Sequence, residues 1–227
     1  MTSFRILAVS LSWAVLATPV LSAGDFSRYR SFRLGTDLAT IAGQARMDPS
    51  QAKVIHRRPA LIQQLEWRPQ PLGPSTQAEA VSEVVFNFYN GELYRLVVNY
   101  DRYRTEGLTA EDLIDTFSAT YGTATRAAAE ITLPSVYGIE ETLEVLARWE
   151  DAEYSFNLVR FSHQPNFTLV GVSKRRDPLA RAAVIEAVRL DAEEAPQREI
   201  ESQRKQAEAS RAQQEKTRLA NKPSFRP

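Results

Sequence analysis

The segment that decides the fold reads VVFNFYNGELYRLVVNY and spans residues 84–100. Apolar and polar side chains alternate on both sides of Asn90-Gly91, a dipeptide that indicates a β-hairpin turn. A two-residue turn would pair Phe86 with Arg95. A three-residue turn with a glycine bulge would pair Phe86 with Tyr94 and gather the large apolar side chains on one face. A one-residue slip would expose that apolar set, so we predict the three-residue turn.

The same order of elements occurs twice in the chain. The first copy comprises Gly35–Leu38, Leu65–Arg68, Phe86–Phe88 and Tyr94–Val98, and the second comprises Thr109–Leu113, Ala147–Glu150, Phe156–Leu158 and Phe167–Val172. Each copy is a helix signal followed by three strand signals. A repeat of about 70–80 residues indicates a duplicated unit. We therefore predict an α+β fold of two tandem αβββ repeats, with antiparallel sheets that helices cover on one face.

Helix-start signals divide the chain into segments. The expected N-caps are Thr36, Thr109 and Asp177, with Asp112 completing a capping box and Pro178 following the last cap. The expected segments are a signal peptide at 1–23, a first repeat at 24–106, a second repeat at 107–176, and a C-terminal helix with a charged, partly disordered tail at 177–227. Pro196 is expected to interrupt the last helix.

The N-terminal residues have the pattern of a secretory signal peptide. Arg5 supplies a positive charge, Ile6 to Leu16 is apolar, and small residues allow cleavage after Ser22 or Ala23. The alternative is an uncleaved amphipathic or anchoring helix, although the apolar run is shorter than the about 20 residues of a membrane span. We expect an exported protein of the periplasm or the exterior, with no transmembrane segment after cleavage.

Composition narrows the possible partners and chemistry. The chain has no cysteine, so disulfides and Cys-ligated metals are excluded. Its 28 basic residues balance its 28 acidic ones, which argues against nucleic acid or an anionic membrane as the partner. The tail beyond Gln197 is rich in Glu, Gln, Lys, Arg and Ala. It is either a solvated helix supported by pairs such as Glu201–Lys205 or a disordered segment, and the absence of a heptad disfavours a coiled coil.

Catalytic residue patterns are weak. His56 and His163 lie in different repeats, and each is expected at the surface or in a turn. The cluster Glu140-Glu141-Glu144 has no opposing carboxylate and reads as a solvated loop. Ser118, Ser155 and Ser162 lie in no nucleophile motif. We therefore expect no enzyme activity, no cofactor and no metal.

Six residues are candidates for binding a partner. Trp67 and Trp149 occupy matching places in the two repeats, where they are core residues if they face inward and binding hot spots if they face outward. Asn87 and Arg95 lie on the polar face of the hairpin. Arg102 and Tyr103 lie in a charged link between the repeats, for which local ion pairing is the simpler interpretation.

The element order and the helix starts Gly35-Thr36 and Leu108-Thr109 resemble two known groups over about residues 33–174. One is the β-lactamase-inhibitor protein family, secreted tandems of such units that bind their target on a concave sheet. The other is the small outer-membrane-assembly lipoproteins, which contain single copies of a related unit. The inhibitor has disulfides and the lipoproteins need an N-terminal Cys, so this chain departs from both, and no binding residue carries over.

These features together predict a non-enzymatic binding or inhibitor-like module that uses an exposed sheet face or the charged tail, with another protein as partner. Two alternatives stay open: an envelope-associated structural or assembly protein, and a hydrolase that uses acidic residues.

Overall fold

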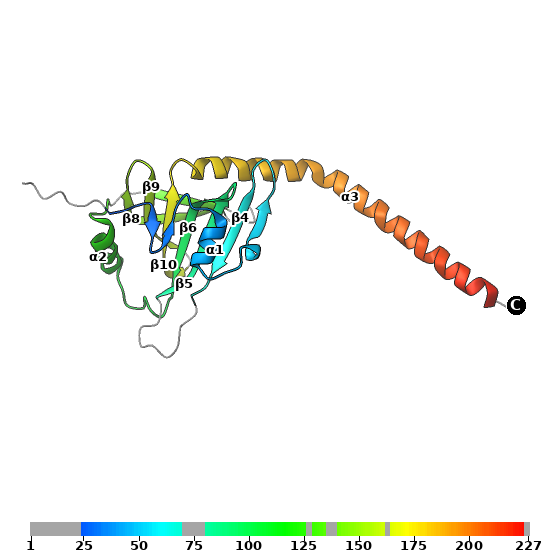
Figure 1. Cartoon of the computed structure of the whole chain (residues 1–227), viewed down its shortest axis with the longest axis horizontal. Coiled ribbons are helices and arrows are strands. Elements are labelled where there is room, and N and C mark those ends of the chain that lie inside the picture. The colour runs from blue at the N-terminus through cyan, green and yellow to red at the C-terminus, as the bar shows by residue number, and fades with distance from the viewer. Residues whose placement is uncertain (1–23, 70–79, 126–128, 135–139, 162–163, 225–227) are drawn as a thin grey trace, which may run out of the picture.

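The computed structural model describes residues 24–69, 80–125, 129–134, 140–161 and 164–224. It is an α+β fold built around one large antiparallel sheet, whose strands run in the order β3-β4-β5-β6-β10-β9-β8-β7 (Figure 1). The strands are β3 (Lys53–His56), β4 (Ile62–Trp67), β5 (Val81–Tyr89), β6 (Glu92–Tyr100), β7 (Ala129–Pro134), β8 (Glu140–Glu150), β9 (Tyr154–Phe161) and β10 (Gln164–Ser173). The predicted signal peptide, residues 1–23, lies outside the described residues.

The remaining elements lie on the two faces of this sheet. Helix α1 (Leu38–Gln44), helix α2 (Ala110–Tyr121) and a small ribbon of β1 (Arg28–Tyr29) and β2 (Phe32–Arg33) contribute to the core on one face. Helix α3 (Asp177–Asn221) begins on the other face and then extends far beyond the sheet (Figure 1). Short 3₁₀ turns, η1 (Pro49–Gln51) and η2 (Lys222–Ser224), follow α1 and α3.

The main core lies between the sheet and helices α1 and α2. Its fully buried side chains come from both halves of the chain and include Ile41, Leu65, Phe86, Phe88, Leu96, Trp149, Phe156 and Leu169. Ile41 and Ala42 of α1 and Ala45 at its C-cap are buried in this core. A second cluster on the opposite face packs Ala180 and Ala183 of α3 against Ile62 and Tyr94.

The hairpin turn has two residues, so the prediction of a three-residue turn is wrong. Asn90 (φ 50°) and Gly91 (φ 83°) both adopt left-handed backbone conformations, and Tyr89 pairs with Glu92 across the turn. Two consecutive positive φ angles give the mirror-image turn that matches the natural twist of paired strands. The strand twist therefore selects the shorter turn.

The expected bulge exists, but it lies within β6 rather than in the turn. The pairing passes from Asn87↔Arg95 to Phe88↔Leu93, which leaves Tyr94 as the extra residue. Phe86 therefore pairs with Leu96, and Tyr94 packs against α3 on the other face instead of joining the main core. The bulge restores the apolar face that the two-residue turn alone would have lost.

One of the three predicted helix N-caps is confirmed and the other two are wrong. The capping box of Thr109 and Asp112 is confirmed, and its hydrogen bonds lower the pKa of the Asp112 carboxyl. The cap of α1 is Asp37 rather than Thr36, because the Asp37 side chain accepts the Thr40 N–H at 3.0 Å. Asp177 is not a cap: it lies in the first turn of α3, and its carboxylate contacts arginines instead.

Helix α3 continues through Pro196, so the predicted interruption there is wrong. A proline inside a helix removes one backbone hydrogen bond and typically bends the axis. Figure 1 shows such a change of direction between the part of α3 that lies along the sheet and the part that projects away. The predicted Glu201–Lys205 pair forms at 3.5 Å within the projecting part.

Truncation of Phe86 tests which face of β5 is buried in this register. Phe86 is fully buried, whereas Asn87 is half-buried on the other face. Phe86→Ala should lower the free energy of unfolding by about 3–5 kcal/mol, because it leaves a cavity in the core. Asn87→Ala should cost much less. Equal losses of stability for the two variants in urea unfolding would contradict this register.

Candidate functional site

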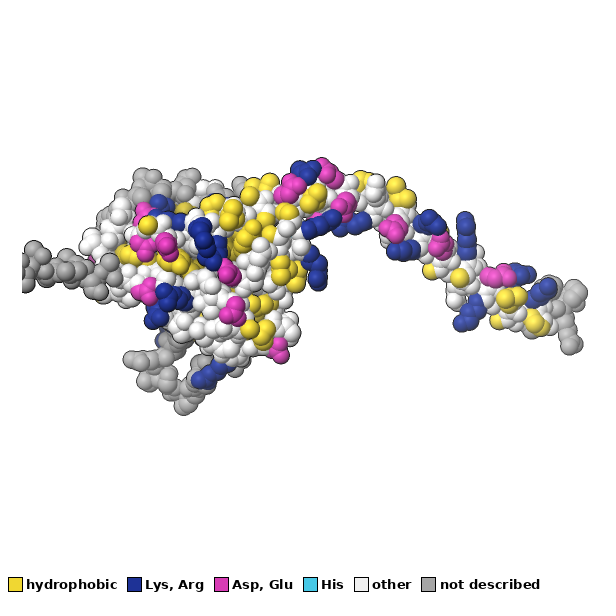
Figure 2. All heavy atoms as spheres, turned by 45° about the horizontal axis from the view of Figure 1, so that its top comes forward, with side chains coloured by type: hydrophobic (Ala, Val, Ile, Leu, Met, Phe, Trp, Pro, Cys, Tyr) yellow, Lys and Arg dark blue, Asp and Glu magenta, His cyan; other side chains and the backbone are white. Residues whose placement is uncertain are grey.

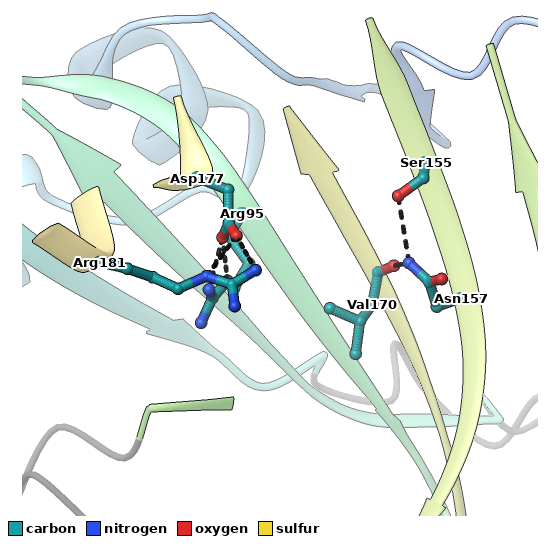
Figure 3. A network of polar contacts seen from close by, with 6 residues as sticks. All are labelled: Arg95, Ser155, Asn157, Val170, Asp177 and Arg181. Atoms are coloured by element: carbon teal, nitrogen blue, oxygen red, sulfur yellow. Dashed lines mark hydrogen bonds and ion pairs between the residues drawn. The ribbon is translucent and has the colours of Figure 1, made fainter. Parts of the chain in front are cut away.

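A buried ion-pair network joins the sheet to the first turn of α3. The Arg95 side chain is 4% exposed and that of Asp177 3%. Arg95 Nε donates to Asp177 Oδ1 at 2.8 Å, and Arg181 Nε donates to Asp177 Oδ2 at 2.7 Å. The Nη2 atom of each guanidinium bonds the same oxygen as its Nε (Figure 3). One carboxylate therefore serves two arginines.

A second polar group lies across the neighbouring strands β10, β9 and β8. Asn157 Nδ2 donates to Ser155 Oγ at 3.2 Å and to the Val170 carbonyl oxygen at 3.4 Å (Figure 3). Arg148 Nε donates to Asn157 Oδ1 at 2.7 Å. The amide of Asn157 is thereby fully oriented, because its oxygen can only accept and its nitrogen can only donate.

These two groups line one pocket of about 190 Å³ on the α3 side of the sheet. Its wall contains Arg95, Arg148, Lys174 and Arg181, together with Glu150. Lys174 Nζ contacts Glu150 Oε2 at 2.7 Å and also donates to the Asp151 carbonyl oxygen at 2.6 Å. Cationic side chains from β6, from β8, from the end of β10 and from helix α3 thus converge on a single pocket.

Further along α3, contacts with the sheet become sparser. Burial against α3 raises the pKa of the Tyr94 hydroxyl, an effect that the nearby Arg95 partly offsets. At the last such contact, Arg58 Nη1 donates to Glu194 Oε1 at 2.7 Å, and this bond lowers the pKa of Glu194. The C-terminal part of α3 runs away from the sheet domain (Figure 1).

The side of α3 that faces away from the sheet carries apolar side chains. Ile185 and Ile200 are each 66% exposed and Val188 is 47% exposed. Ala192 and Pro196 are also exposed and lie between them in sequence. Figure 2 shows hydrophobic side chains recurring along the long helix among Lys, Arg, Asp and Glu. We call Ile185, Val188, Ala192, Pro196 and Ile200 the outer stripe.

Of the predicted binding residues, Arg95 lies in the pocket, and Asn87 is its direct neighbour on β5. Trp149 is buried at 1% exposure and donates from Nε1 to the Gly122 carbonyl oxygen at 3.0 Å, so it is a core residue with no open face. Trp67 is partly buried, and its ring packs edge-on against Phe32 at 5.3 Å. Neither tryptophan offers a wide exposed ring.

Arg102 and Tyr103 lie away from the Arg95 pocket, in the link after β6. The Arg102 guanidinium lies 5.6 Å from the centre of the Tyr103 ring, which is 75% exposed. Arg102 also lines a separate hollow of about 420 Å³ with Arg160 and Phe167. The structure therefore divides the six predicted residues among the core, the pocket and this link.

The residues weighed for catalysis are scattered. His56 ends strand β3, and His163 and Ser162 lie outside the described residues. Glu144 is exposed on β8, and the side chains of Glu140 and Glu141 are not described. Ser118 accepts from Trp149 Nε1 at 3.3 Å. Within the described ranges, no group of three metal-ligating side chains occurs.

No sequence pattern identified Arg148, Lys174, Asp177 or Arg181 as site residues. Two signals were present: Asp177 and Arg181 are four positions apart on a helix, and Arg148 interrupts the apolar pattern of β8. Their convergence depends on strand order, which short-range patterns do not contain.

Comparison with protein-family models, with curated proteins and with solved structures gave no significant match to this chain. None of the described helices is long and apolar enough to cross a membrane.

Removal of the shared carboxylate tests the network. Asp177→Ala should lower the free energy of unfolding by about 3–5 kcal/mol, because it leaves the buried Arg95 charge without a partner. The control is Glu150→Ala, which breaks the half-exposed Lys174–Glu150 pair and should cost about 0–1 kcal/mol. Denaturant unfolding of both variants measures the difference. Similar losses of stability in the two variants would show that burial does not make the Arg95–Asp177 pair contribute more to stability than a half-exposed pair.

Proposed function

We propose that this chain is an exported, non-enzymatic protein-binding module whose contact surface is the outer stripe of α3. The observation that carries the proposal is that α3 has two apolar faces. Ala180, Ala183 and Ala187 are buried against the sheet domain, whereas Ile185, Val188 and Ile200 are exposed. The partner is another protein that covers this second face.

Helix geometry supports this surface. A residue two positions away lies about 200° around a helix, so Ile185 points away from the sheet that buries Ala183 and Ala187. From Ile185 the outer stripe advances by three and then by four residues, which keeps its members on one side of the helix. Grooves that bind helices use anchors at this spacing. The partner therefore needs an apolar groove.

Charges beside the stripe are already paired within α3. Arg189 contacts Glu186 and Glu193, and these bonds raise the pKa of Arg189. Arg204 Nε contacts Glu208 Oε1 at 2.9 Å further along the helix. Because each of these charges has a partner of opposite sign on the same helix, apolar contact rather than net charge would dominate recognition.

The two halves of the fold are further proposed to be tandem αβββ repeats. The sheet order supports this, since β4-β5-β6 and β8-β9-β10 run toward the same β6–β10 junction from opposite edges. Each set follows a short helix, and the paired segments Phe86-Asn87-Phe88 and Phe156-Asn157-Leu158 occupy the equivalent strands β5 and β9. In this proposal β3 and β7 are additions at the outer edges.

An envelope assembly role would use the same helix over a longer reach. The residues from Ala195 to Asn221 would extend about 40 Å at 1.5 Å per residue. A projecting arm of this length favours bridging between a folded domain and a separate surface.

Export itself predicts a shortened chain. Signal cleavage after Ser22 or Ala23 should yield a mature protein that starts at Ala23 or Gly24. Intact-mass measurement of the protein recovered from the periplasm or the medium tests this. A recovered chain that starts at Met1 or Thr2 would rule out the proposed cleavage.

The introduction of charged residues into the stripe tests the binding surface. The double variant Ile185→Glu/Ile200→Glu should reduce partner recovery at least about tenfold after cross-linking in the exporting cell, because it places two charges in an apolar contact. Ser202→Glu is the matched control, since Ser202 is exposed but lies about 200° from Ile200 on the helix. Quantitative mass spectrometry of the cross-linked partner measures recovery.

Truncation after Ala195 gives a second control on folding. The projecting part of α3 runs away from the sheet domain (Figure 1), so its removal should change stability by no more than about 0.5 kcal/mol. The proposed binding surface would be contradicted if the double variant, Ser202→Glu and the parent chain all recovered the same amount of partner.

A further inference from the structure

We propose that the pocket at the start of α3 is a binding site for a small oxyanion, a solute that carries a carboxylate or phosphate group. This inference does not depend on the outer stripe, which begins at Ile185, one turn beyond Arg181 on α3. It rests on the charge, the free donors and the size of the pocket.

The charge of the pocket is positive even after every ion pair is counted. Asp177 neutralises only one of its two arginines, Arg95 and Arg181. Glu150 neutralises Lys174, and Arg148 contacts the neutral amide of Asn157. Among the described residues, the pocket therefore keeps two formal positive charges. Part of this charge lies on the Arg95 guanidinium, which is almost fully buried. An uncompensated charge in such a place is costly.

Hydrogen-bond donors remain for a ligand. Arg95 and Arg181 each use Nε and Nη2 on Asp177, which leaves the two Nη1 groups without an acceptor among the described side chains. Arg148 uses only Nε, so neither of its Nη groups has an acceptor among the described side chains. Arginine presents such donors in the planar fork that matches carboxylate and phosphate oxygens.

Strand order sets the arrangement of these donors. Arg95 on β6 and Arg148 on β8 are separated by β10 and β9 and are offset by two residues along the strands, so their backbones lie about 16 Å apart at the usual spacings. Long side chains from both sides can reach a group held between them. The floor between them contains Val170, Val172 and the oriented amide of Asn157. A floor that joins apolar side chains to a polar amide, with cations at both ends, suits a compact anion.

The volume of the pocket limits the size of the ligand. At about 190 Å³ the pocket exceeds the space that a single water needs. It is also smaller than the about 300–1,000 Å³ of pockets that enclose drug-sized molecules. A free small oxyanion fits this size.

Titration calorimetry with two probes, inorganic phosphate and succinate, tests the proposal at constant ionic strength balanced with sodium chloride. At least one probe should bind saturably at one site per chain. Arg148→Gln should weaken that binding at least about tenfold, because it removes an ionic partner of the anion. The probe that binds more tightly identifies the ligand as a phosphate or a carboxylate.

Two further variants keep the outcome decisive. Lys174→Gln removes a half-exposed cation of the pocket and should also weaken binding. It replaces Arg148→Gln as the test if a thermal melt shows that Arg148→Gln does not fold. Arg204→Gln removes an exposed cation of the projecting helix and should leave binding unchanged. Absence of saturable binding for both probes in the millimolar range, or equal affinity in all variants, would overturn the proposal.

Discussion

The antiparallel pairing of β6 with β10 is the contact on which the rest of the structure depends. It runs from Arg95↔Val172 to Asn99↔Thr168 and is the junction between the two halves within the described sheet. The pairing places Val98 beside Leu169, both fully buried, so one core can extend across both halves. Glycine at 171 is needed at this junction, because a Cβ there would lie 2.5 Å from Cε1 of Phe156.

The same junction determines where the long helix starts. Strand β10 ends at Ser173, and α3 begins at Asp177, directly beside the end of β6 that carries Arg95. The Arg95–Asp177 pair joins residues that are 82 positions apart in sequence. The basic pocket follows from this placement, because the helix brings Arg181 to a sheet face that already carries Arg148. Core, helix position and pocket thus share one structural origin.

Local patterns predicted the elements that their own residues determine. Alternation identified β4, β5, β6, β8, β9 and β10, and the capping residues Thr109 and Asp112 identified α2. Strand β3 was not predicted, since Lys53–His56 has little alternation and depends on β4 for its pairing. Arg95 was recognised as a polar outer residue, but its partner Asp177 was interpreted as a helix cap. Only the pairing of distant strands brings those two charges together, and no short stretch of sequence encodes that pairing.

The ion pair also explains how a helix faced with alanines holds one position on the sheet. Ala180, Ala183 and Ala187 are small, so their contacts alone would change little if the helix slid along its axis. Burying two charges gains little net stability, because desolvation offsets most of their attraction. A shift of one helical turn, about 5.4 Å, would nevertheless separate Arg95 from Asp177. The buried Arg95 charge would then have no partner, because Asp177 would keep only Arg181 of its own helix. That penalty favours a single register and a single rotation of α3. The rotation in turn keeps Ile185 and Val188 on the outside, so the network that forms one wall of the pocket also orients the exposed apolar face of the helix.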